Sequence, residues 1–330
     1  MSHTAFIVTG GAGFIGCNLV HALNARGHGD ITVVDDLNHL EKQRNLEGMR
    51  FSEYVDKRDF RARFLAGKQP DVATVFHLGA CSSTTQLDEA YLEDNNVRYT
   101  RELCKWALAR GAHFVYASSA ATYGDGSLGY SDSHEQTPGL RPLNPYGRSK
   151  QAFDMWALEE GLLSNRIVGI KYFNVYGPFE EHKGDMRSVV NKAFRQICDT
   201  GVLRLFRSHR DDYRDGEQIR DFVYVKDAVA VTLFFHDHPG LAGLYNCGTG
   251  KARTWNDLGR AVFAAMDLNP RIEYVDMPGS IRERYQYHTQ ADTEKLRAAG
   301  YAQPFTPLEG GIGDYVRNYL SADMGAGKSQ

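Results

Sequence analysis

The sequence predicts an α/β fold in which a doubly wound parallel sheet is joined to a smaller, mostly C-terminal domain. Short apolar runs alternate with helical patterns over the first half of the chain, as in βαβ units. A glycine cluster follows the first apolar run, and after about residue 178 charged, irregular segments interrupt the alternation. We therefore expect a Rossmann-type nucleotide-binding domain over 1–177, with returning segments at about 220–250. Residues 178–330 are expected to form mainly a substrate-binding domain.

The first helix is predicted between two glycine signals. Apolar residues 6–8 indicate a buried strand, and helical periodicity begins at Phe14. Gly27 is placed to end this helix near Ala25, because glycine readily adopts the left-handed conformation that follows a helix. Residues 31–34 then indicate a second strand, which ends at Asp35.

Further strands are expected at apolar runs, at residues 72–78, 113–117, 167–173, 222–225 and 244–247. Helical segments are expected between them, at about 99–110 and from about Asn144 to Glu160. The segments at 178–219 and 270–300 are expected to be irregular. The strand at 113–117 brings Ser118 and Ser119 to the carboxyl edge of the sheet, where open α/β sheets bind ligands.

Composition excludes several other classes of protein. The 330 residues are 42% hydrophobic and 24% charged, as in soluble globular proteins of about two domains. A formal net charge of −3 provides no field that attracts nucleic acid, and no apolar run reaches the ~20 residues of a membrane span. Five cysteines and twelve histidines lack metal-ligand spacing, and the N-terminus has no signal-peptide pattern. We expect reduced thiols, no metal and a cytoplasmic location.

The glycine cluster has the spacing of a dinucleotide-binding motif. Gly11, Gly13 and Gly16 match G-x-G-x-x-G between a strand and a helix, and Gly10 adds a further turn residue. Such glycines permit a tight turn, close approach of the backbone to a pyrophosphate and close packing of helix on strand. Free N–H groups at the start of the helix would then bind the phosphates.

The residues that follow the second strand leave two cofactors open. Asp35 lies 19 residues after Gly16, close to the spacing at which a carboxylate binds the adenine ribose of NAD. Lys42, Arg44 and Lys57 are cations that could bind the 2′-phosphate of NADP instead, or simply lie on a solvated face.

Ser119, Tyr146 and Lys150 form the candidate catalytic group. Tyr146 and Lys150 are four residues apart and share one face of a predicted helix. A nearby lysine and a cationic nicotinamide would favour the phenolate of Tyr146, which could then act as a base. Ser119 could hold the substrate oxygen. The alternative is that Tyr146 and Lys150 only contact each other on the surface of the helix and have no catalytic role.

These motifs together resemble the extended short-chain dehydrogenase/reductase family, also called the NAD-dependent epimerase/dehydratase family. The resemblance is carried by residues 9–16 (TGGAGFIG), the Tyr146 and Lys150 pair, and 220–225 (RDFVYV). Further stretches are similar to its branch of ADP-heptose 6-epimerases: 79–85 (GACSSTT), 116–124 (YASSAATYG), 173–178 (FNVYGP), 182–184 (HKG) and 284–286 (RYQ). The similarity extends over nearly the full length.

The resemblance implies inversion at C6″ of ADP-heptose through a transient ketone, with NADP as cofactor and NAD as the alternative. Tyr146 would take the hydroxyl proton, and Lys183 would be a second acid/base or only a ligand of the diphosphate. The residues implied to bind the cofactor are Gly10, Gly13, Phe14, Ile15, Gly16, Asp35, Asp36, Lys42, Lys57, Leu78, Gly79, Ala80, Cys81, Ser82, Asn95, Tyr146, Lys150, Val175 and Lys183. Those implied to bind substrate are Ser119, Asn174, Asp185, Lys192, Phe206, Arg220 and Tyr285.

Other functions compete with this one. A nucleotide-sugar 4-epimerase or dehydratase of the same family is the nearest, but Ala120 and Ala121 follow Ser119 where a dehydratase carries an Asp-Glu pair. A cofactor-sensing protein without activity would usually lack the tyrosine or lysine. The resemblance also implies a homo-oligomer, with a pentamer favoured, and no nucleic-acid or membrane partner.

Overall fold

The computed structural model describes residues 5–36, 40–282 and 285–322, without the side chains of residues 280 and 281. Arg284 of the resemblance motif therefore lies outside the described residues. Among the described helices, none is long and apolar enough to cross a membrane. The described residues also contain no cluster of three His, Cys, Asp or Glu side chains that could hold a metal ion.

Seven parallel strands form the main sheet, in the order β11-β6-β5-β4-β1-β2-β3. Their bounds are β1 (Phe6–Thr9), β2 (Ile31–Asp35), β3 (Glu53–Asp56), β4 (Thr74–His77), β5 (His113–Ser119), β6 (Ile167–Tyr172) and β11 (Gly243–Cys247). The chain reverses its direction of travel across the sheet between β1 and β4, which makes this the topological switch point. β3 was not predicted, because its sequence EYVD has no apolar run.

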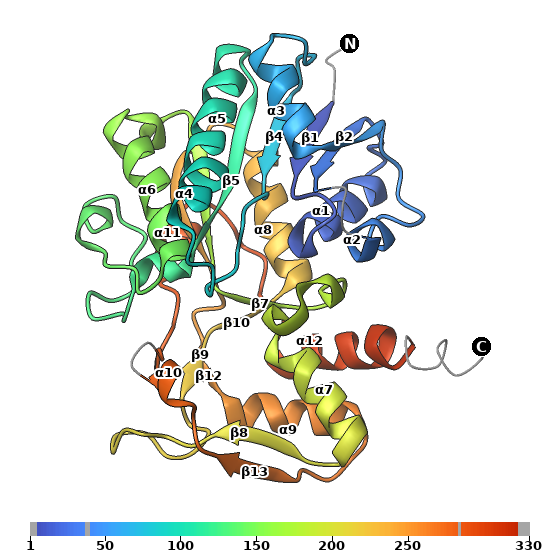
Figure 1. Ribbon diagram of the computed structural model, residues 1–330, viewed down its shortest axis with the longest axis vertical. Helices are drawn as coiled ribbons and strands as arrows, with labels where there is room; N and C mark the ends of the chain where they lie inside the picture. The colour runs from blue at the N-terminus through green and yellow to red at the C-terminus, as the bar shows by residue number, and fades with distance from the viewer. Residues whose placement is uncertain (1–4, 37–39, 283–284, 323–330) are drawn as a thin grey trace.

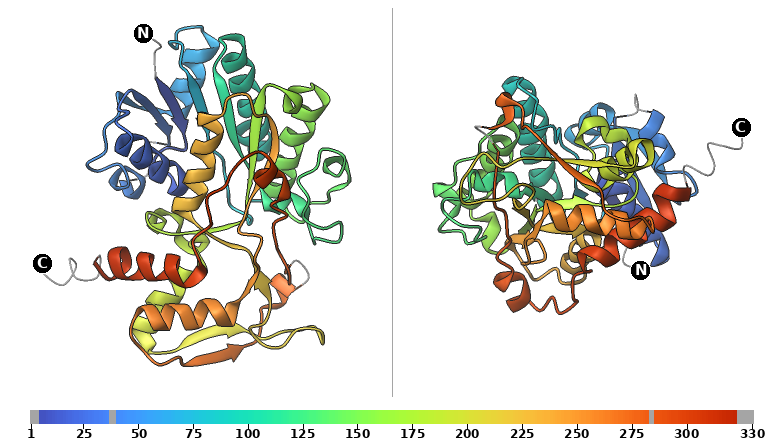
Figure 2. Two further views of the ribbon diagram at one scale, coloured as in Figure 1. Left: turned by 180° about the vertical axis from the view of Figure 1, so that it is seen from behind. Right: turned by 90° about the horizontal axis from the view of Figure 1, so that it is seen from below.

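Helices cover both faces of this sheet, as the predicted doubly wound fold requires (Figures 1 and 2). On β1, Phe6 and Val8 pack in one core and Ile7 packs in the other, because successive side chains of a strand point to opposite faces. The first core includes α1 (Phe14–Ala25) and α8 (Val225–Asp237). The second includes α3 (Lys57–Leu65), α5 (Tyr99–Ala109) and α6 (Pro145–Glu159).

A third core lies below the sheet in Figure 1 and is formed by later segments of the chain. It contains α7 (Val189–Thr200), β8 (Leu203–Phe206), α9 (Trp255–Ala265), β13 (Ile272–Val275) and α12 (Leu308–Tyr315). β8 and β13 pair in parallel. The expectation of an irregular 178–219 segment was wrong for α7 and β8, because Val190, Ala193, Phe194 and Ile197 form a buried helical stripe beneath the charged residues.

Two short pairings lie between these parts of the molecule in Figure 1. β7 (Asn174–Tyr176) pairs in parallel with β10 (Phe222–Tyr224), and β9 (Ile219–Arg220) pairs in antiparallel with β12 (Arg253–Thr254). The strand predicted at 222–225 therefore exists but does not join the main sheet. The run at 244–247 does join it, as β11 beside β6.

The remaining elements are short: α2 (Leu40–Arg44), α4 (Glu89–Leu92), η1 (Glu93–Arg98), η2 (Ala120–Tyr123), η3 (Thr137–Gly139), η4 (Leu162–Ser164), η5 (Glu181–Met186), α10 (Gly279–Arg282), α11 (Glu294–Ala298) and η6 (Val316–Leu320). Four of them lie at candidate site residues: α2 contains Lys42, η1 contains Asn95, η2 begins after Ser119 and η5 contains Lys183.

Candidate active site

A cavity of about 730 Å³ opens at the carboxyl edge of the main sheet. Its lining includes the ends of β1, β2, β4 and β5 and the N-terminal turns of α1 and α6. It also includes β7, the segment around Lys183, and Trp255 at the start of α9. The cavity has the volume typical of a small-molecule or cofactor site and lies at the topological switch point.

Every residue predicted to bind the cofactor or to take part in catalysis lines this cavity. These residues come from segments as far apart in sequence as Gly10 and Lys183, so the fold brings them together. Asn174, one of the predicted substrate residues, lines it as well.

The glycine turn has the shape that a pyrophosphate requires. Gly10 has a φ of +68°, and a side chain there would lie 2.7 Å from the Gly79 backbone. A methyl group on Gly16 would collide with the Gly10 carbonyl. α1 begins after Gly13 with no side-chain cap and no acidic residue in its first turn, so its N–H groups are available to an anion. These residues fit a nicotinamide dinucleotide.

Two lysines and two carboxylates meet at the end of β2. Asp35 is 6% exposed, accepts hydrogen bonds from two backbone N–H groups, and lies 2.7 Å from Lys42 Nζ. Lys57 Nζ donates to Asn95 Oδ1 at 3.1 Å and lies 3.9 Å from Asp36 Oδ2. Lys42 therefore offsets the charge of the Asp35 carboxylate that the sequence assigned to the ribose.

Tyr146 and Lys150 lie on α6 because of a well-formed helix start. Asn144 caps the helix by accepting from Gly147 N–H at 2.8 Å, and Pro145 occupies its first position. Tyr146 is thus in the first turn and Lys150 one turn later. A side chain at Gly147 would come within 2.8 Å of the Ala121 carbonyl, so this glycine lets α6 approach the segment after Ser119.

Ser119 faces Tyr146 from the end of β5. Its Oγ accepts from Ala121 N–H at 3.1 Å, so its own proton is available to Tyr146 or to a ligand. Burial raises the pKa of Tyr146 above its ordinary value, and the hydrogen bond with Ser119 lowers it in part. The expectation of a lower pKa concerned Lys150 together with a cationic nicotinamide, and it stays a prediction. A positive charge on a bound nicotinamide would act against burial and favour the phenolate.

Lys150 is nearly buried, at 6% exposed, and its Nζ donates to the Ala117 carbonyl at 2.7 Å. Burial lowers its pKa to about 8, and the nearby Asp154 carboxylate acts against this effect. The side chain therefore fixes the strand end beside Ser119 and also brings a positive charge close to Tyr146.

Lys183 lines the cavity next to the first turn of α1. Its Nζ lies 4.9 Å from the centre of the Phe14 ring. Burial lowers its pKa, while the charge of Glu180 raises it. Glu180 is itself fully buried and accepts from Ser188 N–H and Oγ, both at 2.5 Å, so it anchors the segment that carries Lys183.

The other predicted substrate residues do not line the cavity, so their contacts stay predictions. Asp185 and Lys192 are exposed, and Lys192 Nζ donates to the Asp185 carbonyl at 3.1 Å. Phe206 is half-buried at the end of β8. Arg220 and Tyr285 lie next to Trp255, which does line the cavity.

Arg220 is a buried cation beside aromatic rings. It is 6% exposed, and its guanidinium lies 5.5 Å from the Trp255 ring centre and 5.1 Å from that of Tyr285. Within residues 5–36, 40–282 and 285–322, no carboxylate forms an ion pair with it. Asp221, the next residue, instead accepts from Thr249 Oγ1 and from the backbone N–H groups of Gly250 and Ala291.

Sequence reasoning missed several residues in and around this site, among them Trp255 and Glu180. Trp255 joins the cavity to Arg220, and its Nε1 donates to Tyr285 Oη at 2.8 Å. Glu180 supports Lys183. Both residues lack a motif of their own, although the capping residue Thr254 predicts a helix that starts at Trp255.

Comparison with known proteins gives consistent matches over most of the chain. The model of the NAD dependent epimerase/dehydratase family matches residues 6–248. A relative from Nitratidesulfovibrio vulgaris (strain DP4), an ADP-L-glycero-D-manno-heptose-6-epimerase, is 55% identical over 318 residues that cover 96% of this chain and 98% of the relative.

Solved structures of related enzymes have the same fold. The ADP-L-glycero-D-manno-heptose-6-epimerase of Helicobacter pylori has a TM-score of 0.80 at 26% identity, and the match covers 96% of each chain. The UDP-glucose 4-epimerase of Thermus thermophilus, solved in complex with NAD, has a TM-score of 0.73 at 27% identity. That match covers 96% of this chain and 99% of the other.

Proposed function

The chain belongs to the NAD-dependent epimerase/dehydratase family, and from this premise we propose that it inverts C6″ of ADP-D-glycero-β-D-manno-heptose. The product is ADP-L-glycero-β-D-manno-heptose, a heptose donor for the lipopolysaccharide core. One observation carries this function: Tyr146 of α6 and Lys183 of η5, two groups able to transfer protons, line a single cavity. Two such groups suit an inversion in which the oxygen of one carbon is presented in two orientations.

A nicotinamide dinucleotide, when bound, supplies a hydride acceptor that can later return the hydride. Tyr146 takes the proton of the C6″ hydroxyl as C6″ is oxidised to a ketone, and Lys150 holds a positive charge beside the phenolate. Ser119 donates a hydrogen bond to the substrate oxygen. The C5″–C6″ bond then rotates, so that reduction occurs on the opposite face of the ketone.

Lys183 delivers the proton to the oxygen after this rotation. Its position in the lining of the cavity and its lowered pKa suit an acid that must also lose its proton easily. Glu180 keeps this pKa from falling further. Lys183 as a ligand of the diphosphate is the second candidate role, and a kinetic test that separates the two roles is given in the Discussion.

Arg220 is our candidate ligand for the diphosphate of the substrate. A guanidinium pairs well with phosphate oxygens, and this one is held by two aromatic rings without a carboxylate partner among the described residues. Asn174 of β7 lines the cavity. We propose that the substrate-binding part of the chain is formed mainly by residues 178–330, and that the protein acts as a homo-oligomer, with a pentamer favoured.

We further propose that the cofactor is NADP. Lys42 and Lys57 bring two cations to the position where the adenine ribose would lie, and Lys42 offsets the charge of Asp35. A 2′-phosphate would otherwise be repelled by that carboxylate. NAD remains the alternative, since Asp35 could bind the ribose hydroxyls if Lys42 moved.

Replacing Lys42 with methionine should change the cofactor preference. We expect the Kd for NADP to rise about tenfold or more, as a charge-assisted contact of roughly 1.5–3 kcal/mol is lost. The Kd for NAD should stay the same or fall, because Asp35 is released. Titration of the two dinucleotides against protein fluorescence measures both values, and Lys68→Met, at an exposed lysine, is the matched control. An equal loss for both dinucleotides would contradict the assignment to the 2′-phosphate.

The activity itself is tested by proton NMR of ADP-D-glycero-D-manno-heptose incubated with the protein and no added reductant. We expect conversion to a mixture with the L-glycero epimer, because the reaction is neutral in oxidation state. Conversion of a UDP-hexose instead would indicate a 4-epimerase, and loss of water would indicate a dehydratase. Bound dinucleotide, seen in the absorbance of the protein, without any turnover would indicate a cofactor-sensing protein.

A further inference from the structure

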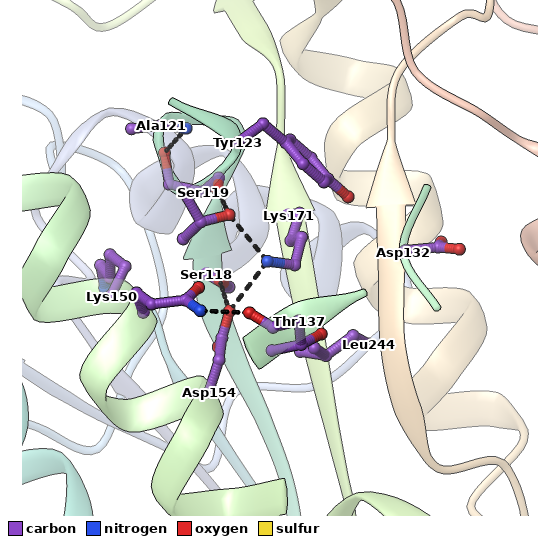
Figure 3. Close-up of polar contacts among 12 residues, drawn as sticks. Ser118, Ser119, Ala121, Tyr123, Asp132, Thr137, Lys150, Asp154, Lys171 and Leu244 are labelled. Carbon is purple, nitrogen blue, oxygen red and sulfur yellow. Dashed lines mark hydrogen bonds and ion pairs between the residues drawn. The ribbon is translucent and has the colours of Figure 1, made fainter. Parts of the chain in front are cut away.

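A buried ion pair lies next to the carboxyl end of β5, the strand that carries Ser119, and joins α6 to β6 (Figure 3). Asp154 of α6 and Lys171 of β6 are both 0% exposed, and Lys171 Nζ lies 3.0 Å from Asp154 Oδ2. Removing two charges from water costs more than their attraction usually returns, and apolar residues of similar size often stabilise a protein as well or better. Fold stability alone therefore does not account for this pair.

The Asp154 carboxylate binds one face of β5 on both sides of Ala117. Tyr116 Oη donates to Oδ1 at 2.8 Å, and Ser118 Oγ donates to Oδ2 at 2.7 Å. Because alternate side chains of a strand share a face, both donors point toward α6. On the same strand, the Ala117 carbonyl accepts from Lys150 Nζ. Three consecutive residues before Ser119 are thus tied to α6.

Lys171 extends the same network to the residues after Ser119. Its Nζ donates to Thr122 Oγ1 at 2.7 Å, and the Thr122 hydroxyl donates to the Ser119 carbonyl at 2.8 Å. The Nζ also lies 5.0 Å from the centre of the Tyr123 ring. The ion pair therefore joins the strand before Ser119 to the turn after it.

The spacing on α6 connects this network to the catalytic face. Tyr146, Lys150 and Asp154 are each four residues apart, so they lie along one face of the helix. On the basis of the function proposed above, we propose that Asp154 and Lys171 are positioning residues. They hold Ser119 opposite Tyr146, and Asp154 supplies the negative charge that faces Lys150.

The charged and titratable groups around Lys150 come from several elements. Asp154 and Tyr146 lie on α6, Cys81 follows β4, and the neutral His77 ends β4. Asp154 raises the pKa values of both Lys150 and Tyr146. Its removal should lower both, so that Lys150 loses its positive charge at a lower pH and Tyr146 ionises at a lower pH.

The groups that face Asp154 itself are Lys171 on β6, Lys150 on α6, Tyr116 and Ser118 on β5, and Tyr123 on η2. Lys171 is the cation that forms an ion pair with the carboxylate. Removing the Asp154 carboxylate alone would leave the positive charge of Lys171 buried without a partner, which is strongly destabilising. A test needs variants that avoid this.

Two variants test the proposal on the intact protein. The double variant Asp154→Asn/Lys171→Met removes both charges at nearly constant volume. We expect its kcat for ADP-heptose to fall about tenfold or more, with little change in KM, because the reacting groups are misplaced. Both limbs of the pH profile of kcat should move to lower pH. Thr122→Val removes the hydroxyl that links Lys171 to the Ser119 carbonyl, and it leaves both charges of the ion pair in place. It should therefore lower kcat without moving either limb.

Asp132→Asn is the matched control. Asp132 is also a buried carboxylate, at 3% exposed, and it accepts from Asn246 N–H at 2.7 Å. It acts electrostatically on Tyr123 and Tyr245 rather than on Lys150. The pH profile of this variant should match that of the wild type.

The outcomes separate this proposal from the proposed function. A wild-type protein that does not convert ADP-heptose would refute the function, and that assay comes first. With an active wild type, an unchanged kcat in Thr122→Val or an unmoved pH profile in the folded double variant would overturn the positioning role. If the double variant does not fold by circular dichroism, Thr122→Val alone decides the positioning role.

Discussion

Tyr146→Phe is expected to lower the kcat for ADP-heptose by about 10²-fold or more, because the variant has no group that can take the C6″ proton. Phenylalanine keeps the ring and its packing in the first turn of α6. The Kd for the dinucleotide should therefore change little, since the glycine turn and the residues at the end of β2 are untouched. Steady-state turnover followed by NMR and a dinucleotide titration measure the two quantities.

Tyr245→Phe is the matched control for this substitution. Tyr245 is buried in β11, the strand beside β6 at the edge of the main sheet. Its hydroxyl donates to the Ala242 carbonyl at 3.1 Å. Its loss should cost about 1 kcal/mol of stability and leave turnover unchanged. If Tyr146→Phe retained turnover within a few-fold of the wild type, Tyr146 would not be the base.

Lys183→Met is expected to lower kcat by about 10²-fold and to leave the KM for ADP-heptose nearly unchanged. Methionine retains the length of the side chain and its contact with the Phe14 ring, so the fold should be retained. The substitution removes the proton donor that Lys183 offers to the far side of the ketone. Measuring kcat and KM separately is the deciding step.

The same measurement separates the two roles of Lys183. A ligand of the diphosphate binds the ground state and the transition state alike, so its loss raises KM and preserves kcat. An acid/base acts in the transition state, so its loss lowers kcat. Lys251→Met, at an exposed lysine, is the control, and it should affect neither constant.

Local signals predicted the nucleotide-binding part of the fold well. α1 begins at Phe14 and ends at Ala25 as expected, because the glycines on either side determine both ends. β3 was missed because polar residues enclose a single buried valine, Val55. α7 was missed because its charged residues conceal the apolar spacing of Val190, Ala193, Phe194 and Ile197, which is the signal that could predict it.

Chain topology by itself predicted the part of the site where strand ends meet, and the family resemblance added more distant residues such as Lys183. The carboxyl ends of parallel strands lie at one edge, so the motifs around Gly13 and Ser119 had to come together. Trp255 and the Asp154–Lys171 pair depend instead on how distant segments pack. A buried lysine in an otherwise apolar strand is the one local signal that points to a hidden partner, since Lys171 lies within IVGIKY.

The bare N-terminus of α1 has a consequence for the lifetime of the protein. With Gly13 in place of a capping side chain, a bound dinucleotide provides the missing partners for the first helix and becomes a component of the folded state. Stability then rises with the logarithm of the dinucleotide concentration relative to its Kd. Because the catalytic cycle regenerates the starting form of the dinucleotide, its release is not a step of turnover. Tight retention can therefore protect the protein from unfolding and proteolysis without slowing the reaction.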